Sequence, residues 1–129
     1  MAKVFLDTNA LIDFVEQRAN FDETQLSGHE LFISPLSIHI LSYLYKYSVP
    51  EKKLGNINEI FNLIPLDTPI TTKSLSGPTK DFEDNVQLHS ASETECDIFL
   101  TSDRKLLDLK FFGKMQIIKK LQYPLTPGK

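Results

Sequence analysis

The sequence has almost no cysteine and no long apolar run. Cys96 is the only cysteine among 129 residues, so the chain cannot form an internal disulfide. It also lacks a Cys/His cluster with zinc-ligand spacing, which excludes a zinc finger. No run approaches the roughly 20 apolar residues that a membrane-spanning helix needs, and residues 1–7 are too short in apolar length for a signal peptide. We therefore expect a soluble, cytoplasmic protein in which any metal is held mainly by oxygen ligands.

An excess of positive charge is also lacking. The net charge of -3 and the pI near 5.6 argue against a protein that coats nucleic acid through bulk positive charge. A nuclease is not excluded, because metal ions held by clustered carboxylates can supply the positive charge that meets a phosphate. Basic residues gather after Asp103, where only Asp108 opposes Arg104, Lys105, Lys110, Lys114, Lys119 and Lys120. We interpret that stretch as a solvated charged face.

The length and composition favour a single domain. A chain of 129 residues with 41% hydrophobic residues can build one core but not two. We expect residues 1–122 to form the domain. Residues 123–129 contain two prolines and a glycine, and we expect them to form a flexible C-terminal tail.

Short apolar runs alternate with stretches of helical period, which is typical of an α/β domain with a mainly parallel sheet. We expect five strands, at residues 4–6, 31–33, 64–66, 98–100 and 115–118. We expect helices at residues 10–15, 36–47, 51–63, 80–95 and 105–109. The remaining segments are a polar loop at 20–28 and turns at 67–78 that include a helical piece around 72–75.

Carboxylates follow two of the expected strands. Asp7 comes directly after the first strand, and Asp103 follows the fourth after only Thr101 and Ser102. Ligand sites of parallel sheets lie beyond the carboxyl ends of the strands, so both side chains should reach the same edge. Asp81 and Asp84 lie at the start of the expected helix at 80–95, on one stripe with Leu88 and Ala91.

Each of these carboxylates also has a simpler explanation. Asp7 and Asp103 can be ordinary helix caps, and Asp81 or Asp84 can be a favourable charge in a first helical turn. Taken together, they predict a cluster of like charges whose repulsion raises pKa values unless a cation neutralises it. Oxygen ligands with several carboxylates favour Mg²⁺ or Mn²⁺, which can activate water for attack on a phosphodiester.

Three segments resemble the PIN domain family in order and spacing: VFLDTNALID, DFEDNVQLHSA and DIFLTSD. The resemblance covers nearly the whole chain and implies a three-layer α/β/α fold. It implies that Asp7, Asp84 and Asp103 are the catalytic, metal-binding carboxylates, and that hydrogen bonds from Thr8, Asn9, Thr101 and Ser102 support them. It further implies a VapC-type toxin ribonuclease or a close relative, with an RNA substrate, a cognate antitoxin and a homodimeric assembly.

The segment ISPLSIHILSYLY departs from the family pattern. The family carries a glutamate in this helix where the present sequence has Ile40. His39 is adjacent but points about 100° away around the helix, and we interpret it as having no metal role. Asp81, one turn before Asp84, is a candidate replacement for the missing carboxylate.

Together with the carboxylates, the resemblance implies a metal-dependent endoribonuclease that hydrolyses RNA phosphodiester bonds. The alternative is a degenerate, non-catalytic PIN-like module that binds RNA or protein. The absence of a glutamate at Ile40 favours this alternative. A haloacid-dehalogenase-type phosphatase also begins with an aspartate after the first strand, but it needs a second aspartate at the position of Asn9.

Overall fold

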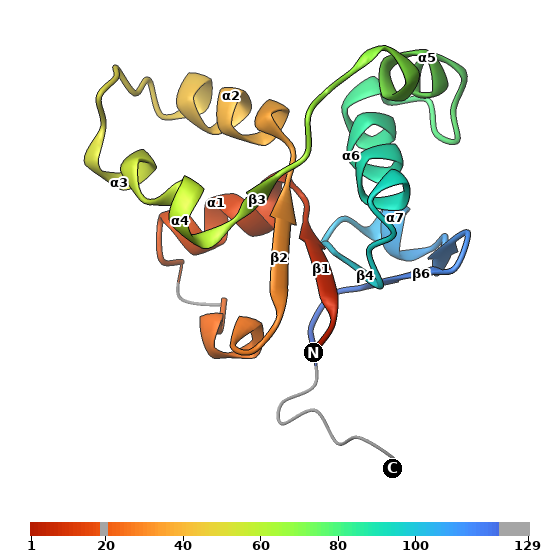
Figure 1. Ribbon diagram of the computed structural model, residues 1–129, viewed down its shortest axis with the longest axis horizontal. Coiled ribbons are helices and arrows are strands. Elements are labelled where there is room, and N and C mark those ends of the chain that lie inside the picture. Colours follow the sequence, from red (N-terminus) through yellow and green to blue (C-terminus); the bar gives the residue numbers. More distant parts are fainter. Residues whose placement is uncertain (19–20, 122–129) are drawn as a thin grey trace.

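The computed structural model describes residues 1–18 and 21–121 and builds them around one sheet (Figure 1). The sheet has six strands in the order β3-β2-β1-β4-β6-β5. All neighbouring strands are parallel except β5 and β6, which are antiparallel. The mainly parallel sheet is confirmed, whereas the expectation of five strands is wrong by one.

The strands are β1 (Lys3–Leu6), β2 (Glu30–Ile33), β3 (Asn62–Leu63), β4 (Ile98–Leu100), β5 (Phe111–Phe112) and β6 (Met115–Ile118). The helices are α1 (Thr8–Val15), α2 (Pro35–Leu44), α3 (Lys52–Gly55), α4 (Ile57–Ile60), α5 (Thr68–Ser76), α6 (Phe82–Glu93) and α7 (Arg104–Leu107). A 3₁₀ helix, η1 (Glu23–Leu26), lies in the segment expected to be a polar loop. The expected tail at 123–129 lies outside the described residues.

Helices cover both faces of the sheet, as the three-layer expectation requires (Figure 1). Alternate residues of β1 divide the core, because successive strand side chains point to opposite faces. Phe5 faces α5, α6 and α7, where its ring stacks on Phe99 with centroids 5.3 Å apart. Val4 and Leu6 face α1, η1 and α4. β1 and β4 are thereby buried on both faces, and they run through the middle of the domain.

Two strand predictions need correction. The third strand lies at Asn62–Leu63 and not at 64–66, because Pro65 has no N–H to continue the ladder. Ile64 still donates to the Ile33 carbonyl at 3.0 Å, which is the last bond of that pairing. The unexpected strand β5 forms because Gly113, with φ of 62°, allows a tight turn into β6.

The helical predictions also differ in detail. The single helix expected at 51–63 is two short helices, α3 and α4, separated at Asn56. The segment expected to be mostly turns contains the nine-residue helix α5. Its start has a clear capping signal, since Asp67 Oδ1 accepts a hydrogen bond from the Ile70 N–H at 3.0 Å and Pro69 lies in the first turn. The helices expected at 36–47 and 80–95 are confirmed as α2, which begins one residue earlier and ends three residues earlier, and α6, which is shorter at both ends.

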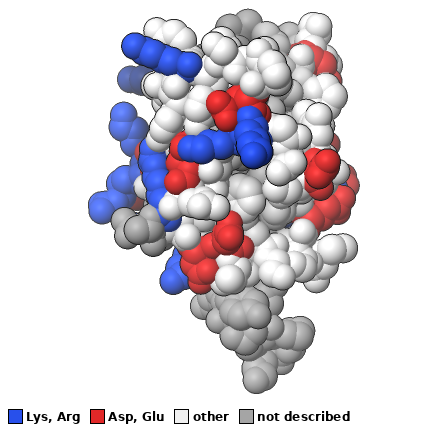
Figure 2. Space-filling view, turned by 90° about the vertical axis from the view of Figure 1, so that its left-hand side faces the viewer, with Lys and Arg blue, Asp and Glu red and all other residues white. Residues whose placement is uncertain are grey.

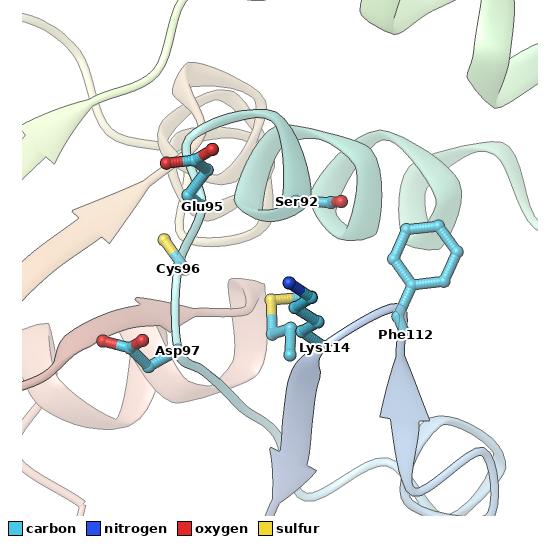
Figure 3. Close-up of a pocket in the computed structure, with 7 residues that line it drawn as sticks. Ser92, Glu95, Cys96, Asp97, Phe112 and Lys114 are labelled. Carbon is cyan, nitrogen blue, oxygen red and sulfur yellow. The ribbon is translucent and has the colours of Figure 1, made fainter.

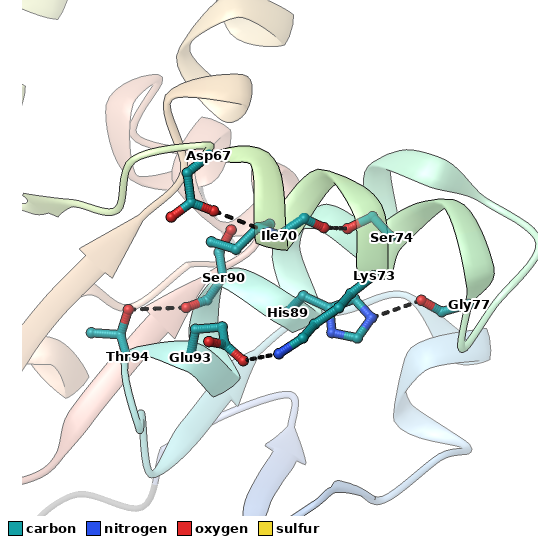
Figure 4. Close-up of polar contacts among 9 residues, drawn as sticks. All are labelled: Asp67, Ile70, Lys73, Ser74, Gly77, His89, Ser90, Glu93 and Thr94. Atoms are coloured by element: carbon teal, nitrogen blue, oxygen red, sulfur yellow. Dashed lines mark hydrogen bonds and ion pairs between the residues drawn. The ribbon is translucent and has the colours of Figure 1, made fainter.

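α5 packs along α6, and polar contacts join the two helices (Figure 4). Lys73 of α5 bridges to Glu93 of α6 at 2.6 Å, and His89 Nε2 contacts the Gly77 carbonyl at 2.8 Å. These contacts hold α5 and α6 together, and the first turn of α6 carries Asp84. Across the described ranges, no helix is long and apolar enough to cross a bilayer.

Candidate functional site

Thr101 links Asp7 and Asp103 at the carboxyl edge of the sheet. Its hydroxyl donates to Asp7 Oδ2 at 2.5 Å and accepts from the Asp103 N–H at 3.0 Å. The Asp7 N–H donates to the Leu100 carbonyl at 3.1 Å, which extends the pairing of β1 with β4. Two aspartates 96 positions apart in the sequence are therefore held by one side chain, as the strand-end argument predicts.

Asp84 approaches this edge from the first turn of α6. It shares a hollow of about 630 Å³ with Asp81, Asp103, Lys80 and Lys105. Asp81 is the N-cap of α6, and its Oδ1 accepts from the Asp84 N–H at 3.0 Å. Asp81, Asp84 and Asp103 thus line one hollow, while Asp7 lies buried beneath the same edge.

Asp7 and Asp103 each cap a helix and also belong to the carboxylate cluster. Asp7 Oδ1 caps α1 by accepting from the Ala10 N–H at 2.8 Å, and Asp103 Oδ1 caps α7 by accepting from the Lys105 N–H at 2.9 Å. These bonds fix the carboxylates in place. Each carboxylate oxygen keeps a second lone pair for another partner.

Burial and mutual repulsion disfavour the charged forms of two carboxylates. The pKa of Asp7 is raised to about 6: burial is the main cause, the charges of Asp84 and Asp103 add to it, and the hydrogen bonds from Thr101 and Ala10 oppose it. The pKa of Asp84 also rises to about 6, first through burial and then through the charges of Asp81, Asp103 and Glu83. Perturbed carboxylates that influence one another in a hollow are candidates for a functional site.

Thr8 lies in a polar network that the sequence only partly predicts. Its N–H donates to Gln87 Oε1 at 2.8 Å, and its hydroxyl lies 2.8 Å from the Ser37 hydroxyl. Gln87 and Ser37 were missed. The signal for Gln87 was available, because this polar residue follows Asp84 at i+3 on the same helix face.

Two other residues expected to support the carboxylates lie farther out. Asn9 is exposed, and no hydrogen bond of its side chain occurs among the described residues. Ser102 is also exposed, and it lines a different hollow from Asp103.

Ile40 does not line the carboxylate hollow. It lies in a shallow apolar hollow with His39, Tyr43, Leu44 and Glu83. Glu83 of α6 is therefore the acidic side chain next to the position where the resemblance implies a glutamate. Asp81 lies in the other hollow, with Asp84.

The fold has counterparts in known proteins. The family model described as "PIN domain" matches residues 3–105. The chain belongs to the PIN domain family. No curated protein matches the PIN chain in sequence.

Two solved structures share the fold of this PIN domain. A crystal structure of VapBC2 from Rickettsia felis, bound to a DNA fragment from their promoter, is similar at 14% identity, with 90% of this chain and 97% of that chain covered and a TM-score of 0.63. The structure of FitAB bound to an IR36 DNA fragment is similar at 14% identity, with 89% and 93% covered and a TM-score of 0.52.

Other surfaces of the PIN domain do not resemble the carboxyl edge. A hollow of about 580 Å³ lies at the amino ends of β4 and β6, where Glu95, Asp97 and Lys114 surround Cys96 (Figure 3). On the face that Figure 2 shows, Lys and Arg side chains gather along the left edge and meet acidic side chains at the centre, whereas Asp and Glu side chains line the right edge. That face offers no uniformly basic surface for nucleic acid.

The donor set at the carboxyl edge fits a divalent cation in its chemistry. All the available donors are oxygens, and the raised pKa values of Asp7 and Asp84 mark like charges that a cation would relieve. Within residues 1–18 and 21–121, however, no three Asp, Glu, His or Cys side chains are close enough to hold one ion. Side chains of this cluster would therefore have to move closer to share a metal.

Proposed function

We propose that this PIN domain is a metal-dependent endoribonuclease of the VapC type, which hydrolyses RNA phosphodiester bonds in the cytoplasm. The observation that carries the proposal is the convergence of Asp7, Asp84 and Asp103 at one sheet edge, where Thr101 links Asp7 to Asp103 and Asp84 shares a hollow with Asp103. Carboxylates with unfavourable charge in a half-buried cluster are a site that Mg²⁺ or Mn²⁺ would occupy. The three aspartates are the proposed ligands, with Asp81 as a further candidate.

The residues around the aspartates have supporting roles in this proposal. The bound cation would lower the pKa of a water molecule and offset charge developing on the phosphate. Thr101 holds Asp7 and the Asp103 backbone in one arrangement. Thr8, held by Gln87 and Ser37, fixes the start of α1 beside Asp7. Lys105 lines the hollow with Asp84 and lowers its pKa, so it offers a positive charge to a phosphate there.

The resemblance also implies a cognate antitoxin and a homodimer, and both belong to the proposal. Tyr43 and Leu44 of α2 are 76% and 58% exposed, and they flank Ile40 in the apolar hollow. Clustered apolar side chains on a surface commonly mark protein interaction sites. This surface supports a protein partner on α2.

The second candidate is a non-catalytic PIN-like module that binds RNA or protein. Two observations favour it: Ile40 stands where the family carries a glutamate, and the described side chains do not surround a common metal position. The two candidates differ in whether RNA is cut.

Cleavage of a fluorogenic RNA with Mn²⁺ distinguishes them. The proposal expects turnover by the wild type and a loss of at least about a hundredfold in Asp84→Asn, since removing a metal-ligand charge removes transition-state stabilisation. The matched control is Asp108→Asn, which changes an exposed aspartate at the end of α7 and should cleave as the wild type does. RNA binding without cleavage by the wild type would favour the second candidate.

A further inference from the structure

A second hollow lies on the α1 face of the sheet, opposite the acidic one, and reaches the carboxyl edge at Ser102. Its volume is about 400 Å³, and its lining includes Arg18, Phe21, Ser102, Lys119 and Lys120. The lining comes from the end of α1, the start of η1 and the segment after β6. We call it the basic hollow.

The basic hollow and the acidic hollow meet at one short segment. Ser102 lines the basic hollow, and Asp103 lines the acidic hollow with Asp84. Consecutive Cα atoms are only about 3.8 Å apart, so an extended ligand can enter both hollows by crossing this segment. Thr101 anchors the segment through its bonds to Asp7 and the Asp103 N–H, which gives the crossing point a fixed shape.

The two hollows have opposite charge balance. The acidic hollow has three carboxylates, Asp81, Asp84 and Asp103, against two lysines. The basic hollow has three cations, Arg18, Lys119 and Lys120, against two carboxylates.

Not all three cations of the basic hollow are equally available. Arg18 is held by Asp13 and by the Tyr45 hydroxyl. Lys119 and Lys120 are exposed, and neither forms a salt bridge within the described part of the chain. Anionic groups of a ligand are therefore expected to bind at this lysine pair.

Phe21 gives the basic hollow an aromatic surface. It is half-buried, and one side packs against the core cluster on the α1 face. An aromatic ring held in this way beside basic side chains is a common stacking surface for a base of single-stranded nucleic acid. A hollow of about 400 Å³ has room for a small ligand group and not for a duplex.

We propose that single-stranded RNA crosses the Ser102–Asp103 segment, with phosphates on Lys119 and Lys120 and a base stacked on Phe21, while the phosphate to be cut lies in the acidic hollow. This path rests on the proposed ribonuclease function. It adds a surface that binds the RNA strand, which the carboxylates alone do not provide.

The experiment measures binding of a fluorescently labelled single-stranded RNA of twelve nucleotides by anisotropy in EDTA, so that cleavage does not interfere. Lys119→Gln/Lys120→Gln is compared with Lys52→Gln/Lys114→Gln, which removes the same charge from exposed positions on α3 and beside the amino-edge hollow. We expect the first pair to weaken binding about tenfold and to reduce the salt slope by about 1.4, as for two lost phosphate contacts on a single strand. The control pair should change neither.

A second variant and a second readout follow the same path. Phe21→Leu keeps an apolar side chain against the core and should weaken binding about tenfold, within the range for loss of one stacked base. In cleavage assays with Mn²⁺, the variants should raise KM and leave kcat unchanged, because they remove binding made equally in the ground and transition states. If a variant fails to fold, photocrosslinking of 4-thiouridine RNA to the wild type decides, and the crosslinked peptide should contain Phe21.

The outcomes separate this path from the proposed function. Equal losses in both lysine pairs, no loss in either, or tighter binding of a duplex would overturn the path, even if the wild type cleaves RNA. Absence of cleavage with intact RNA binding at Lys119 and Lys120 would overturn the nuclease and leave the path in place. Equal binding of the 2′-deoxy oligonucleotide would support the path and show that it does not read the 2′-hydroxyl.

Discussion

Asp7→Asn should stabilise the metal-free protein at pH 8 and destabilise it at pH 4. Asp7 is only 4% exposed, and burial is the main cause that raises its pKa from 3.8 to about 6. The folded state therefore binds a proton more tightly than the unfolded chain. The stability that follows from this difference is present below about pH 4 and is lost as the pH rises through about 6.

The magnitude follows from the two pKa values. At about 1.4 kcal/mol per pH unit, keeping Asp7 ionised in the fold costs about 3 kcal/mol at neutral pH. Asparagine removes this charge and keeps the bond from the Ala10 N–H. Its amide can donate to Thr101, but the Thr101 hydroxyl proton then loses its acceptor, at a cost of about 1 kcal/mol. The net gain is about 2 kcal/mol at pH 8, and about 1 kcal/mol is lost at pH 4, where the charge no longer matters.

The assay is thermal unfolding followed by circular dichroism in EDTA, from pH 4 to pH 8. A gain of about 2 kcal/mol corresponds to a rise in Tm of about 8 °C at pH 8 for a domain of this size. Asp108→Asn serves as the control and should follow the wild type across the range. If Asp7→Asn is destabilised equally at pH 4 and pH 8, burial is not what raises the pKa of Asp7. Our account of a cluster destabilised by its own negative charges is then wrong.

Four further predictions concern the carboxylate cluster, Ile40 and Cys96. Millimolar Mn²⁺ should raise the Tm of the wild type and not of Asp84→Asn, because a cation that binds the folded state shifts unfolding; an unchanged wild-type Tm would count against a metal site. Ile40→Glu should lower the stability of the metal-free protein, since it adds a carboxylate beside Glu83. The Mn²⁺ affinities of Ile40→Glu and of Asp81→Ala, each measured against the wild type, show which of the two positions reaches the ion. Cys96, whose thiol pKa burial raises to about 12, should resist Ellman's reagent at pH 8 until the protein unfolds. Cys96→Ser should keep activity while losing about 1–3 kcal/mol of stability through a buried hydroxyl, and a well-folded but inactive variant would show that the site is mislocated.

The sequence predicts the order of the central elements well because their signals are local and strong. β1, β2, β4 and β6 are apolar runs that stand apart from their neighbours, and their parallel pairing follows from the alternation with helices. The short elements were harder to predict. β3 and β5 have two residues each, and they depend on Pro65 and Gly113 more than on any apolar pattern. α5 was underestimated because its polar composition obscured the cap at Asp67.

The candidate site shows the same division. Asp7 and Asp103 follow from strand ends, and their common link to Thr101 agrees with that placement. The contacts of Gln87 and Ser37 with Thr8 depend on how α2 and α6 pack across the edge, which periodicity within one segment does not report. The sequence suggests Asp81 as a replacement for the carboxylate missing at Ile40, and Asp81 does lie in the hollow with Asp84, whereas the acidic side chain beside Ile40 itself is Glu83.

The central position of β1 also determines when the site can exist during folding. The partner of β1 on one side, β2, is close to it in the sequence, with Lys3 opposite Glu30. Its partner on the other side, β4, lies more than 90 residues away, with Val4 opposite Ile98. Contacts of such separation form late, because a long loop must close before they are gained. A nascent chain that ends before β4 leaves Asp7 without Thr101 and Asp103 and presents an unpaired edge of β1. The carboxylate cluster is therefore absent until β4 and Asp103 have been synthesised and have paired with β1, so chemistry that depends on the cluster cannot begin before that point.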